Sequence, residues 1–346
     1  MIKIAICSDI HWSQYSSIVR SRGKKYSTRL ENLINSLNWF EHLADEHGCD
    51  EIIYLGDTMD RSDINAEELT ALQDVKFSSL PHTLLVGNHD ASISNLEFST
   101  ASVFKLIKAS VITEPEVRNM ADGIDFYFIP YLTPDKIKPL KHYLLNNDHK
   151  KVILTHNDIA GIQYGRFTSQ SGFSVSEILE NCTLFMDGHL HNSCVINDKI
   201  VLAGNLTGQN FTESADKHEH YAYLLTINDD RTITLEPYVN PYAFNFYKLY
   251  INKPEDLSVF DTLKNNAVLS ISCNNKLIPS IDKKIKNNDK IVEYRVVTIY
   301  NNNNNNFDDK VDFKVEDHLQ QFIDYVQTKI PPSEILADEL FKLSGM

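Results

Sequence analysis

Five short apolar runs in this chain each lead directly into Asp, Asn or His residues. The runs have the length of strands and are nearly continuous apolar, which is typical of buried strands. In layered α/β folds the loops that follow such strands converge on one crevice. The pattern therefore predicts an α/β fold that delivers polar side chains to one rim of a sheet. The polar segments are Asp9-Ile10-His11, Gly56-Asp57-Thr58-Met59-Asp60, Gly87-Asn88-His89-Asp90, Thr155-His156 and Gly188-His189-Leu190-His191.

Strands and helices are expected to alternate along the first 240 residues. Apolar residues recur at three- and four-residue spacing from Leu30 to Ala44, which predicts an amphipathic helix that Gly48 ends. Shorter helices are expected at 98–108 and 175–179. The expected strands are 2–7, 51–55, 83–86, 151–154, 182–186 and 200–203, followed by a hairpin of 221–227 and 232–239. Such alternation indicates a layered α/β domain.

The character of the chain changes near Asn240-Pro241. Three further strand-like runs (246–251, 268–271 and 292–300) predict a smaller α/β domain, with the six asparagines 301–306 as a surface loop. The last thirty residues read as two helices interrupted at Pro331-Pro332. The apolar stripe 335–343 in the second helix either docks on its own domain or binds a partner. The predicted domains are thus 1–241, 242–315 and a helical tail over 316–346.

Composition excludes several classes of protein. The five cysteines are odd in number and form no CxxC pair, so neither a disulfide framework nor a zinc ribbon is expected and a cytoplasmic location is the default. No apolar run is long enough to span a membrane, and the first residues lack the layout of a signal peptide. The net charge of −14 argues against nucleic acid. Locally basic stretches run against that average, and each is either a solvated surface or a contact for a polyanion; the first comprises Arg20, Arg22, Lys24 and Lys25.

The residue types in the five segments fit a pair of metal ions. Carboxylate, imidazole and amide donors without thiolates suit Mn²⁺, Fe²⁺ or Zn²⁺. Two cations about 3.5–4 Å apart can clamp a phosphate and activate a water molecule, with one carboxylate bridging them. Each segment alone is weak evidence, since a lone histidine such as His156 is more often structural. All five in this order favour a dinuclear site.

The five segments resemble the motifs DxH, GDxxD, GNHD, isolated H and GHxH of the calcineurin-like metallophosphoesterase superfamily. The resemblance implies a four-layer αββα sandwich with a smaller α/β capping domain and a helical tail. It also implies that Asp9, His11 and His191 bind one metal ion, that Asn88, His156 and His189 bind the other, and that Asp57 bridges them. His89 would face the scissile phosphate, and Asp60 would orient His89. The ions would most simply be Mn²⁺, with Mg²⁺, Fe²⁺ and Zn²⁺ as alternatives.

Within this superfamily the chain is most similar to Mre11/SbcD-type nuclease subunits, especially those of bacteriophage recombination. Arg29, the segment from Gly204 to Glu213, and the second α/β region after Pro241 carry this resemblance. It implies a DNA exonuclease or endonuclease that processes DNA ends in the bacterial host cytoplasm. It also implies a Rad50/SbcC-like SMC-type ATPase as partner, contacted by the stripe at 335–343, and a homodimer formed through 30–44 or 98–108.

Two departures keep other readings open. Trp12-Ser13 stands where this branch has Leu-Gly, so either the His11 loop turns differently or Trp12 stacks on a base. Asp60-Arg61 resembles protein serine/threonine phosphatases, in which the arginine grips a terminal phosphate. Arg61 therefore favours the alternative of a phosphatase or nucleotide phosphodiesterase. A non-catalytic scaffold is disfavoured because all seven predicted ligands and His89 are present. The candidate substrate-binding residues are Arg61, Trp12, Arg20, Arg22, Lys24 and Lys25.

Overall fold

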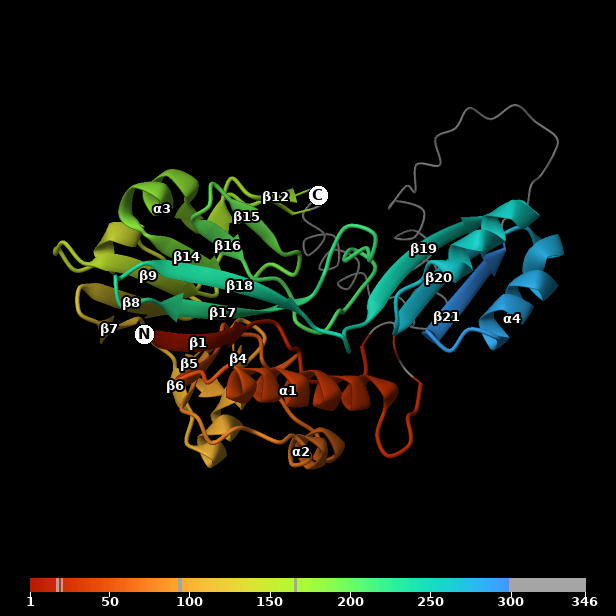
Figure 1. Cartoon of the computed structure of the whole chain (residues 1–346), viewed down its shortest axis with the longest axis horizontal. Coiled ribbons are helices and arrows are strands. Elements are labelled where there is room, and N and C mark those ends of the chain that lie inside the picture. Colours follow the sequence, from red (N-terminus) through yellow and green to blue (C-terminus); the bar gives the residue numbers. More distant parts are fainter. Residues whose placement is uncertain (17–18, 20, 93–94, 165–166, 299–346) are drawn as a thin grey trace, which may run out of the picture. The chain divides into compact units, whose positions relative to one another are not determined.

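The computed structural model describes residues 1–16, 19, 21–92, 95–164 and 167–298 (Figure 1). Its first large sheet has the strand order β18-β17-β1-β2-β3-β6. The strands β1, β2, β3 and β6 are parallel, and β17 joins β1 in antiparallel fashion. Their bounds are β1 Ile2–Cys7, β2 Glu51–Tyr54, β3 His82–Leu85, β6 Ser110–Ile112, β17 Tyr221–Ile227 and β18 Ile233–Val239.

The second large sheet has the order β15-β16-β14-β9-β8-β7, with its four central strands parallel. Its strands are β7 Glu116–Ala121, β8 Ile124–Ile129, β9 Lys150–Thr155, β14 Leu184–Asp187, β15 Cys194–Ile196 and β16 Ile200–Leu202. Side chains such as Ile53 from the first sheet and Leu154 from the second form one buried layer between the two sheets. The sequence placed all five polar segments on one rim; the structure divides them between two sheets.

Helices cover the outer faces of both sheets. α1 (Thr28–Glu46), α2 (Ala66–Leu72) and the 3-10 helix η1 (Thr100–Ile107) pack on the first sheet. α3 (Val175–Asn181) and η2 (Leu140–His142) pack on the second. The four-layer αββα sandwich that the resemblance implied is therefore confirmed. α1 begins where the Ser27 side chain accepts a hydrogen bond from the Leu30 amide, and it ends just before Gly48, whose φ of +61° suits a residue without a side chain.

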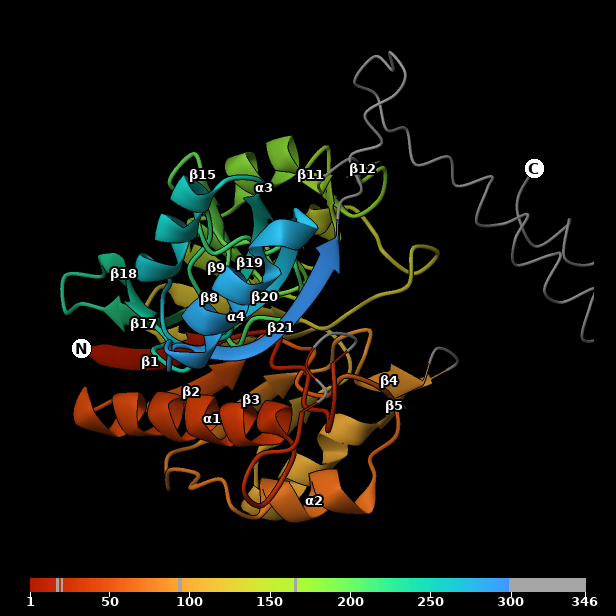
Figure 2. The ribbon, with the colours of Figure 1, turned by 90° about the vertical axis from the view of Figure 1, so that its right-hand side faces the viewer.

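A third sheet contains the parallel strands β19 (Asn245–Ile251), β20 (Ala267–Cys273) and β21 (Ile291–Thr298). η3 (Pro254–Asp261), η4 (Asn275–Leu277) and α4 (Ile278–Lys286) cover one of its faces and share a core with it. In Figures 1 and 2, α4 lies on the side of this sheet that faces away from the two large sheets. Residues 1–300 form one compact unit, so the boundary at 241 remains a prediction.

Short strand pairs complete the described part of the chain. They are β4 (Ala91–Ser92) with β5 (Asn95–Ser99), β10 (Ile159–Ala160) with β13 (Phe173–Ser174), and β11 (Gln163–Tyr164) with β12 (Phe167–Thr168). The predicted strands are confirmed to within a few residues, but β6, β7, β8, β15 and the short pairs were not predicted. The region 98–108, expected to be a helix, is the end of β5 followed by η1. The asparagine loop, the stripe at 335–343 and the tail over 316–346 lie outside the described residues. No helix in the described ranges is long and apolar enough to cross a membrane.

We expect the layer between the two large sheets to supply much of the stability. Ile53 is fully buried in that layer, so Ile53→Ala should lower the free energy of unfolding by about 2–5 kcal/mol. Val239→Ala, at an exposed position of β18, should change it by about 0.5 kcal/mol or less. Guanidinium unfolding followed by circular dichroism measures both. Equal losses in the two variants would contradict this assignment of the core.

Candidate metal centre

The loops after five strands bring the predicted ligands together at the carboxyl ends of both large sheets. Three clusters have donor atoms that all lie within 4.8 Å of one another: Asp9, His11 and His191; His11, Asp57 and His89; Asp57, His156 and His189. Asp57 belongs to two of these clusters, with Oδ2 at 3.8 Å from His11 Nε2 and 3.2 Å from His156 Nε2. Asn88 precedes His89, whose backbone N–H donates to Asp57 Oδ1 at 2.8 Å. Six of the seven predicted ligands and His89 are thus gathered in one place, and Asn88 adjoins His89 in the chain.

We define the first half-site as Asp9, His11 and His191, and the second half-site as Asn88, His156 and His189. The first draws on the loops after β1 and β14, and the second on those after β3, β9 and β14. Asp57, which follows β2, lies between the half-sites. A carboxylate in that position can bind both ions of a pair.

Three of these ligands have a backbone conformation that residues other than glycine rarely adopt. Asp9, His11 and Asp57 have φ values of +52°, +50° and +46°. Left-handed backbone at non-glycine residues is uncommon and costs free energy, and it concentrates at functional sites. Backbone hydrogen bonds from Asp9 N to Gly56 O (3.2 Å) and from His11 N to Asp57 O (3.0 Å) hold the two loops together. The strands therefore impose the strain that turns the ligands toward one point.

Two glycines make room for this crowding. Gly56 has a φ of +101°, and a Cβ atom there would lie 2.4 Å from His156 Nδ1. A Cβ atom on Gly87 would lie 2.2 Å from Asp57 Oδ1. Neither position can accept a side chain without displacing a predicted ligand.

Several buried donor atoms at the centre have no hydrogen-bond partner among the described residues. They are Asp9 Oδ1, Asn88 Oδ1, His156 Nε2 and His189 Nδ1. Buried polar atoms in folded proteins are nearly always paired. These atoms come from both half-sites, and they are the oxygen and nitrogen types that bind divalent cations. The residues present therefore fit two metal ions.

Each histidine of the half-sites is held through its other ring nitrogen. An oxygen partner behind the ring fixes its orientation and tautomer and leaves the opposite nitrogen for a cation. The contacts are His11 Nδ1 with Asp60 Oδ1 at 3.2 Å, His191 Nδ1 with Glu213 Oε1 at 2.9 Å, His156 Nδ1 with Leu55 O at 2.7 Å, and His189 Nε2 with Asp158 Oδ1 at 3.5 Å. The sequence suggested no role for Glu213 or Asp158. Their partners, His191 and His189, lie 22 or more residues away in the chain.

The carboxylates dominate the electrostatics of the centre. Burial by itself lowers the pKa of His11, but Asp60, Asp9 and Asp57 outweigh it and raise that pKa to about 10. Burial likewise opposes protonation of His156, yet Asp57 raises its pKa to about 10. The same histidines hold the pKa of Asp57 far below its usual value despite its burial. The carboxylates thus favour positive charge on the surrounding histidines, a charge that bound cations would also supply.

His89 differs from the ligands in being exposed. Its Nδ1–H donates to the backbone carbonyl of Asp60 at 2.8 Å, which leaves Nε2 free to face a substrate. Its ring lies 4.8 Å from that of His11, measured between centroids. We expected the Asp60 side chain to orient His89. In the structure the Asp60 carbonyl does so, and the Asp60 carboxylate contacts His11 instead.

The predicted substrate-binding residues are mostly committed elsewhere. Trp12 is 2% exposed and its indole N–H donates to Glu68 O, so it cannot stack on a base. Arg61 pairs with Glu68 at 2.6 Å and Asp63 at 3.0 Å, which removes the argument that it grips a phosphate. Of the four basic residues, Arg22 pairs with Glu67 and Lys25 with Asp74, each at 2.6 Å. Lys24 is exposed and forms no ion pair with a described residue. Arg20 lies outside the described residues.

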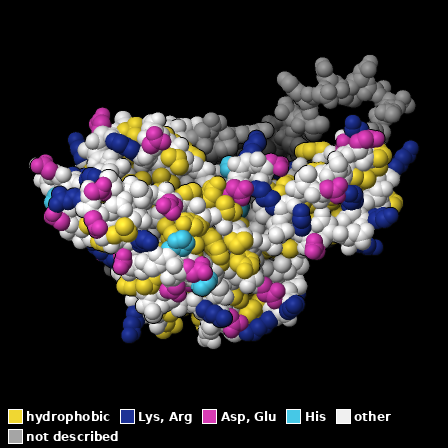
Figure 3. All heavy atoms as spheres, viewed as in Figure 1, with side chains coloured by type: hydrophobic (Ala, Val, Ile, Leu, Met, Phe, Trp, Pro, Cys, Tyr) yellow, Lys and Arg dark blue, Asp and Glu magenta, His cyan; other side chains and the backbone are white. Residues whose placement is uncertain are grey.

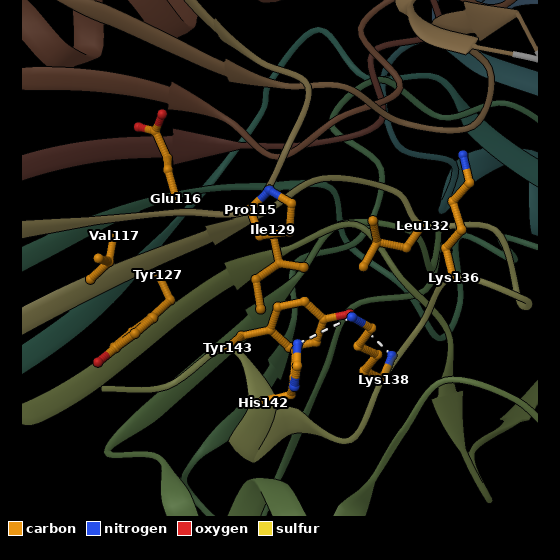
Figure 4. A pocket seen from close by; sticks show the side chains of 10 residues that line it. All are labelled: Pro115, Glu116, Val117, Tyr127, Ile129, Leu132, Lys136, Lys138, His142 and Tyr143. Atoms are coloured by element: carbon orange, nitrogen blue, oxygen red, sulfur yellow. Dashed lines mark hydrogen bonds between the residues drawn. The ribbon is translucent and has the colours of Figure 1, made fainter. Parts of the chain in front are cut away.

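A hollow of about 430 Å³ lies elsewhere, on the outer side of the second sheet (Figure 4). Val117, Tyr127, Ile129 and Tyr143 contribute to its walls, and Lys138 Nζ contacts His142 Nε2 at 3.2 Å beside it. None of the predicted metal ligands lines this hollow. The chemistry at the strand ends therefore defines the candidate site.

Comparison with known proteins supports the same region. The family model described as calcineurin-like phosphoesterase matches residues 2–226, which include every predicted ligand. No curated protein matches the chain. A dimetal phosphatase structure from Danio rerio aligns with 11% identity, covering 69% of this chain and 96% of that one, at a TM-score of 0.42. The structure of TT1561 from Thermus thermophilus aligns with 15% identity, covering 68% and 98%, at a TM-score of 0.39.

Metal binding is expected to release protons. Because the pKa values of His11 and His156 are raised to about 10, both rings are protonated at pH 7.5, and a cation must displace those protons. The apparent Mn²⁺ affinity should therefore rise between about pH 6.5 and 8.5. Calorimetry in buffers of different ionisation enthalpy counts the protons, and His142→Asn, at an exposed histidine outside the centre, should leave the count unchanged. Equal heats in all buffers would contradict the expectation.

Proposed function

The chain belongs to the calcineurin-like phosphoesterase family, and on that premise we propose that it is a two-metal-dependent DNA nuclease. Family membership makes it a metal-dependent phosphoester hydrolase. The substrate is the open part of the question, because phosphatases, nucleotide phosphodiesterases and nucleases share this chemistry. The proposal for DNA is carried by the face of the third sheet that α4 leaves uncovered.

The face that α4 leaves uncovered combines aromatic, basic and small polar side chains with the acidic Glu293, and Val19 and Phe211 pack against its Phe246 end. Successive residues of a strand alternate between faces, and Tyr247, Leu249 and Ile251 fill the core under α4. Lys248 and Tyr250 therefore project from the opposite face, where Lys248 is in register with Ser270 and Arg295. Tyr250 is 66% exposed. Exposed aromatic rings that stack on bases, beside cations that contact phosphates, are the usual means of binding nucleic acid.

One end of the same face lies beside the segment whose Glu213 contacts the predicted ligand His191. Phe246 shares the face and packs against Phe211 with ring centroids 5.2 Å apart, and the Arg295 guanidinium lies 5.1 Å from the Phe211 ring. Phe211 belongs to the segment that ends at Glu213, the partner of His191. A strand of nucleic acid lying on this face would thus approach the first half-site.

The chain's own residues supply positioning and proton transfer. When bound, two divalent cations would neutralise phosphate charge and activate water, with Asp9, His11, Asp57, Asn88, His156, His189 and His191 as ligands. Hydrolysis adds water across one P–O bond, so the leaving oxygen needs a proton. His89, oriented by the Asp60 carbonyl, can donate that proton from Nε2. We propose Mn²⁺ as the native ion because the donors mix oxygen and nitrogen without thiolates; Mg²⁺, Fe²⁺ and Zn²⁺ fit the same set.

Exposed apolar side chains support the proposal of a homodimer. Phe98 and Leu106, in or beside η1, are 72% and 82% exposed. Large apolar side chains exposed on a surface can mark protein contacts. Of the two regions expected to pair, α1 buries its apolar residues on the first sheet, which favours 98–108. The SMC-type ATPase partner and the location in a bacterial host cytoplasm remain predictions, since the stripe at 335–343 lies outside the described residues.

The second candidate function is a phosphatase or nucleotide phosphodiesterase. The family supports it equally well, and the net charge of −14 favours a small substrate over a polyanion. Figure 3 shows basic and acidic side chains interspersed on the face in view, so the charge does not form one acidic surface there. A non-catalytic scaffold finds no support in the complete ligand set.

One set of assays separates these functions. The purified chain with Mn²⁺ is offered end-labelled duplex DNA, single-stranded DNA and an aryl phosphate monoester. We expect DNA cleavage that His89→Asn reduces about 10²-fold or more, with metal content unchanged. An unaltered rate in His89→Asn would remove the proton-donor role, and monoester turnover with intact DNA would establish the phosphatase.

A matched pair of tyrosines tests the sheet face. Stacking of one base on an aromatic side chain contributes about 1–3 kcal/mol to binding. Tyr250→Ala removes such a side chain, so it should weaken DNA binding and leave monoester hydrolysis unchanged. Tyr294 is in register with Leu269, on the face that carries α4, and Tyr294→Ala should have little effect on either. Equal DNA affinities for the two variants would count against this face.

A further inference from the structure

Arg29 is a buried cation without a carboxylate partner. It is 1% exposed and forms no ion pair anywhere in the described ranges. Burial lowers the pKa of its guanidinium to about 10. Placing an unpaired charge in the interior is costly unless hydrogen bonds compensate for lost hydration. The hydrogen bonds of this side chain therefore indicate its role in the structure.

One arm of the guanidinium holds the peptide between two metal ligands. Arg29 Nη2 donates to Ile10 O at 3.2 Å and to Thr207 Oγ1 at 3.1 Å, and the Thr207 hydroxyl donates to the same Ile10 oxygen at 3.2 Å. Ile10 separates Asp9 from His11, both of which have left-handed backbone. Two donors on one carbonyl thus fix the orientation of the strained segment that presents two of the three ligands of the first half-site.

The other arm holds the segment that orients the third ligand. Arg29 Nη1 donates to Gly208 O at 2.8 Å. Directly after Gly208, the Gln209 amide donates to Glu213 Oε2 at 2.6 Å, and Glu213 Oε1 contacts His191 Nδ1 at 2.9 Å. The guanidinium also lies 5.9 Å from the ring of Phe244, whose amide donates to Thr207 O at 3.0 Å just before β19.

We propose that Arg29 is a positioning residue for the first half-site, which it links to the entry of the third sheet. All three ligands of that half-site depend on it, Asp9 and His11 through Ile10 and His191 through Gly208 and Glu213. The second half-site does not, because Leu55 O and Asp158 back its histidines. The inference rests on the metal ligands of the proposed function but not on DNA as the substrate.

Mn²⁺ titrations of the full chain test this role. Isothermal calorimetry and electron paramagnetic resonance would compare the unchanged protein with Arg29→Met, Arg29→Lys and a control, Arg118→Met. Arg118 is a half-buried arginine that contacts Thr83 and Glu51, away from both half-sites. We expect Arg29→Met to weaken one of two Mn²⁺ sites by roughly 10- to 100-fold, the usual effect of losing a residue that supports a ligand. Arg29→Lys should weaken the same site less than Arg29→Met does. Arg118→Met should bind Mn²⁺ with the affinities of the unchanged protein.

Two further variants identify the weakened site. In a His156→Ala background only the first half-site is intact, and Arg29→Lys should still lower Mn²⁺ affinity there. In a His191→Ala background the same change should have no effect. A lowered melting temperature with both Mn²⁺ affinities unchanged would overturn the proposal in favour of a merely structural role, as would equal weakening of both sites. Fewer than two ions on the unchanged protein would instead refute the ligand assignment. If Arg29→Met does not fold, Arg29→Lys carries the comparison.

Discussion

Negative charge crowded at the carboxyl ends of two sheets is the constraint on which this structure depends. Asp9 and Asp57 are buried close to the same histidines, where water cannot screen them. Protons on the histidines or cations between the ligands can balance that charge. The sandwich holds the carboxylates there by pairing β1 with β2 and fixing both ligand loops in left-handed backbone. Rigidity of the sheets and reactivity of the centre thus have the same origin.

The sequence predicted the parts of this arrangement that local pattern controls. A buried strand followed by a ligand is a local signal, and β1, β2, β3, β9 and β14 all carry it. β8 was not predicted, although it is fully buried, because Asp125 interrupts its apolar run and no metal ligand follows it. The region 98–108 was expected to be a helix, and the structure forms the 3-10 helix η1 there, because apolar spacing alone does not distinguish the helix types.

The roles that sequence could not assign depend on contacts between distant segments. Trp12 and Arg61 were expected at the substrate, but both contact Glu68 of α2, which no local pattern reveals. The loop after β2 places the backbone carbonyl of Asp60 at His89 and the carboxylate of Asp60 at His11. Glu213 stands 22 residues after His191 and could be linked to it only in three dimensions. Residue type predicted the chemistry of the site, while tertiary packing determined which neighbours support it.

The seam between the large sheets and the third sheet does not coincide with the change in sequence character at Asn240-Pro241. The Asn240 side chain donates to Leu206 O at 2.9 Å, and Ala215 N donates to Phe246 O at 3.0 Å, so segments on either side of that point interleave. A chimera joined at residue 241 would therefore separate hydrogen-bonded partners that have adapted to each other.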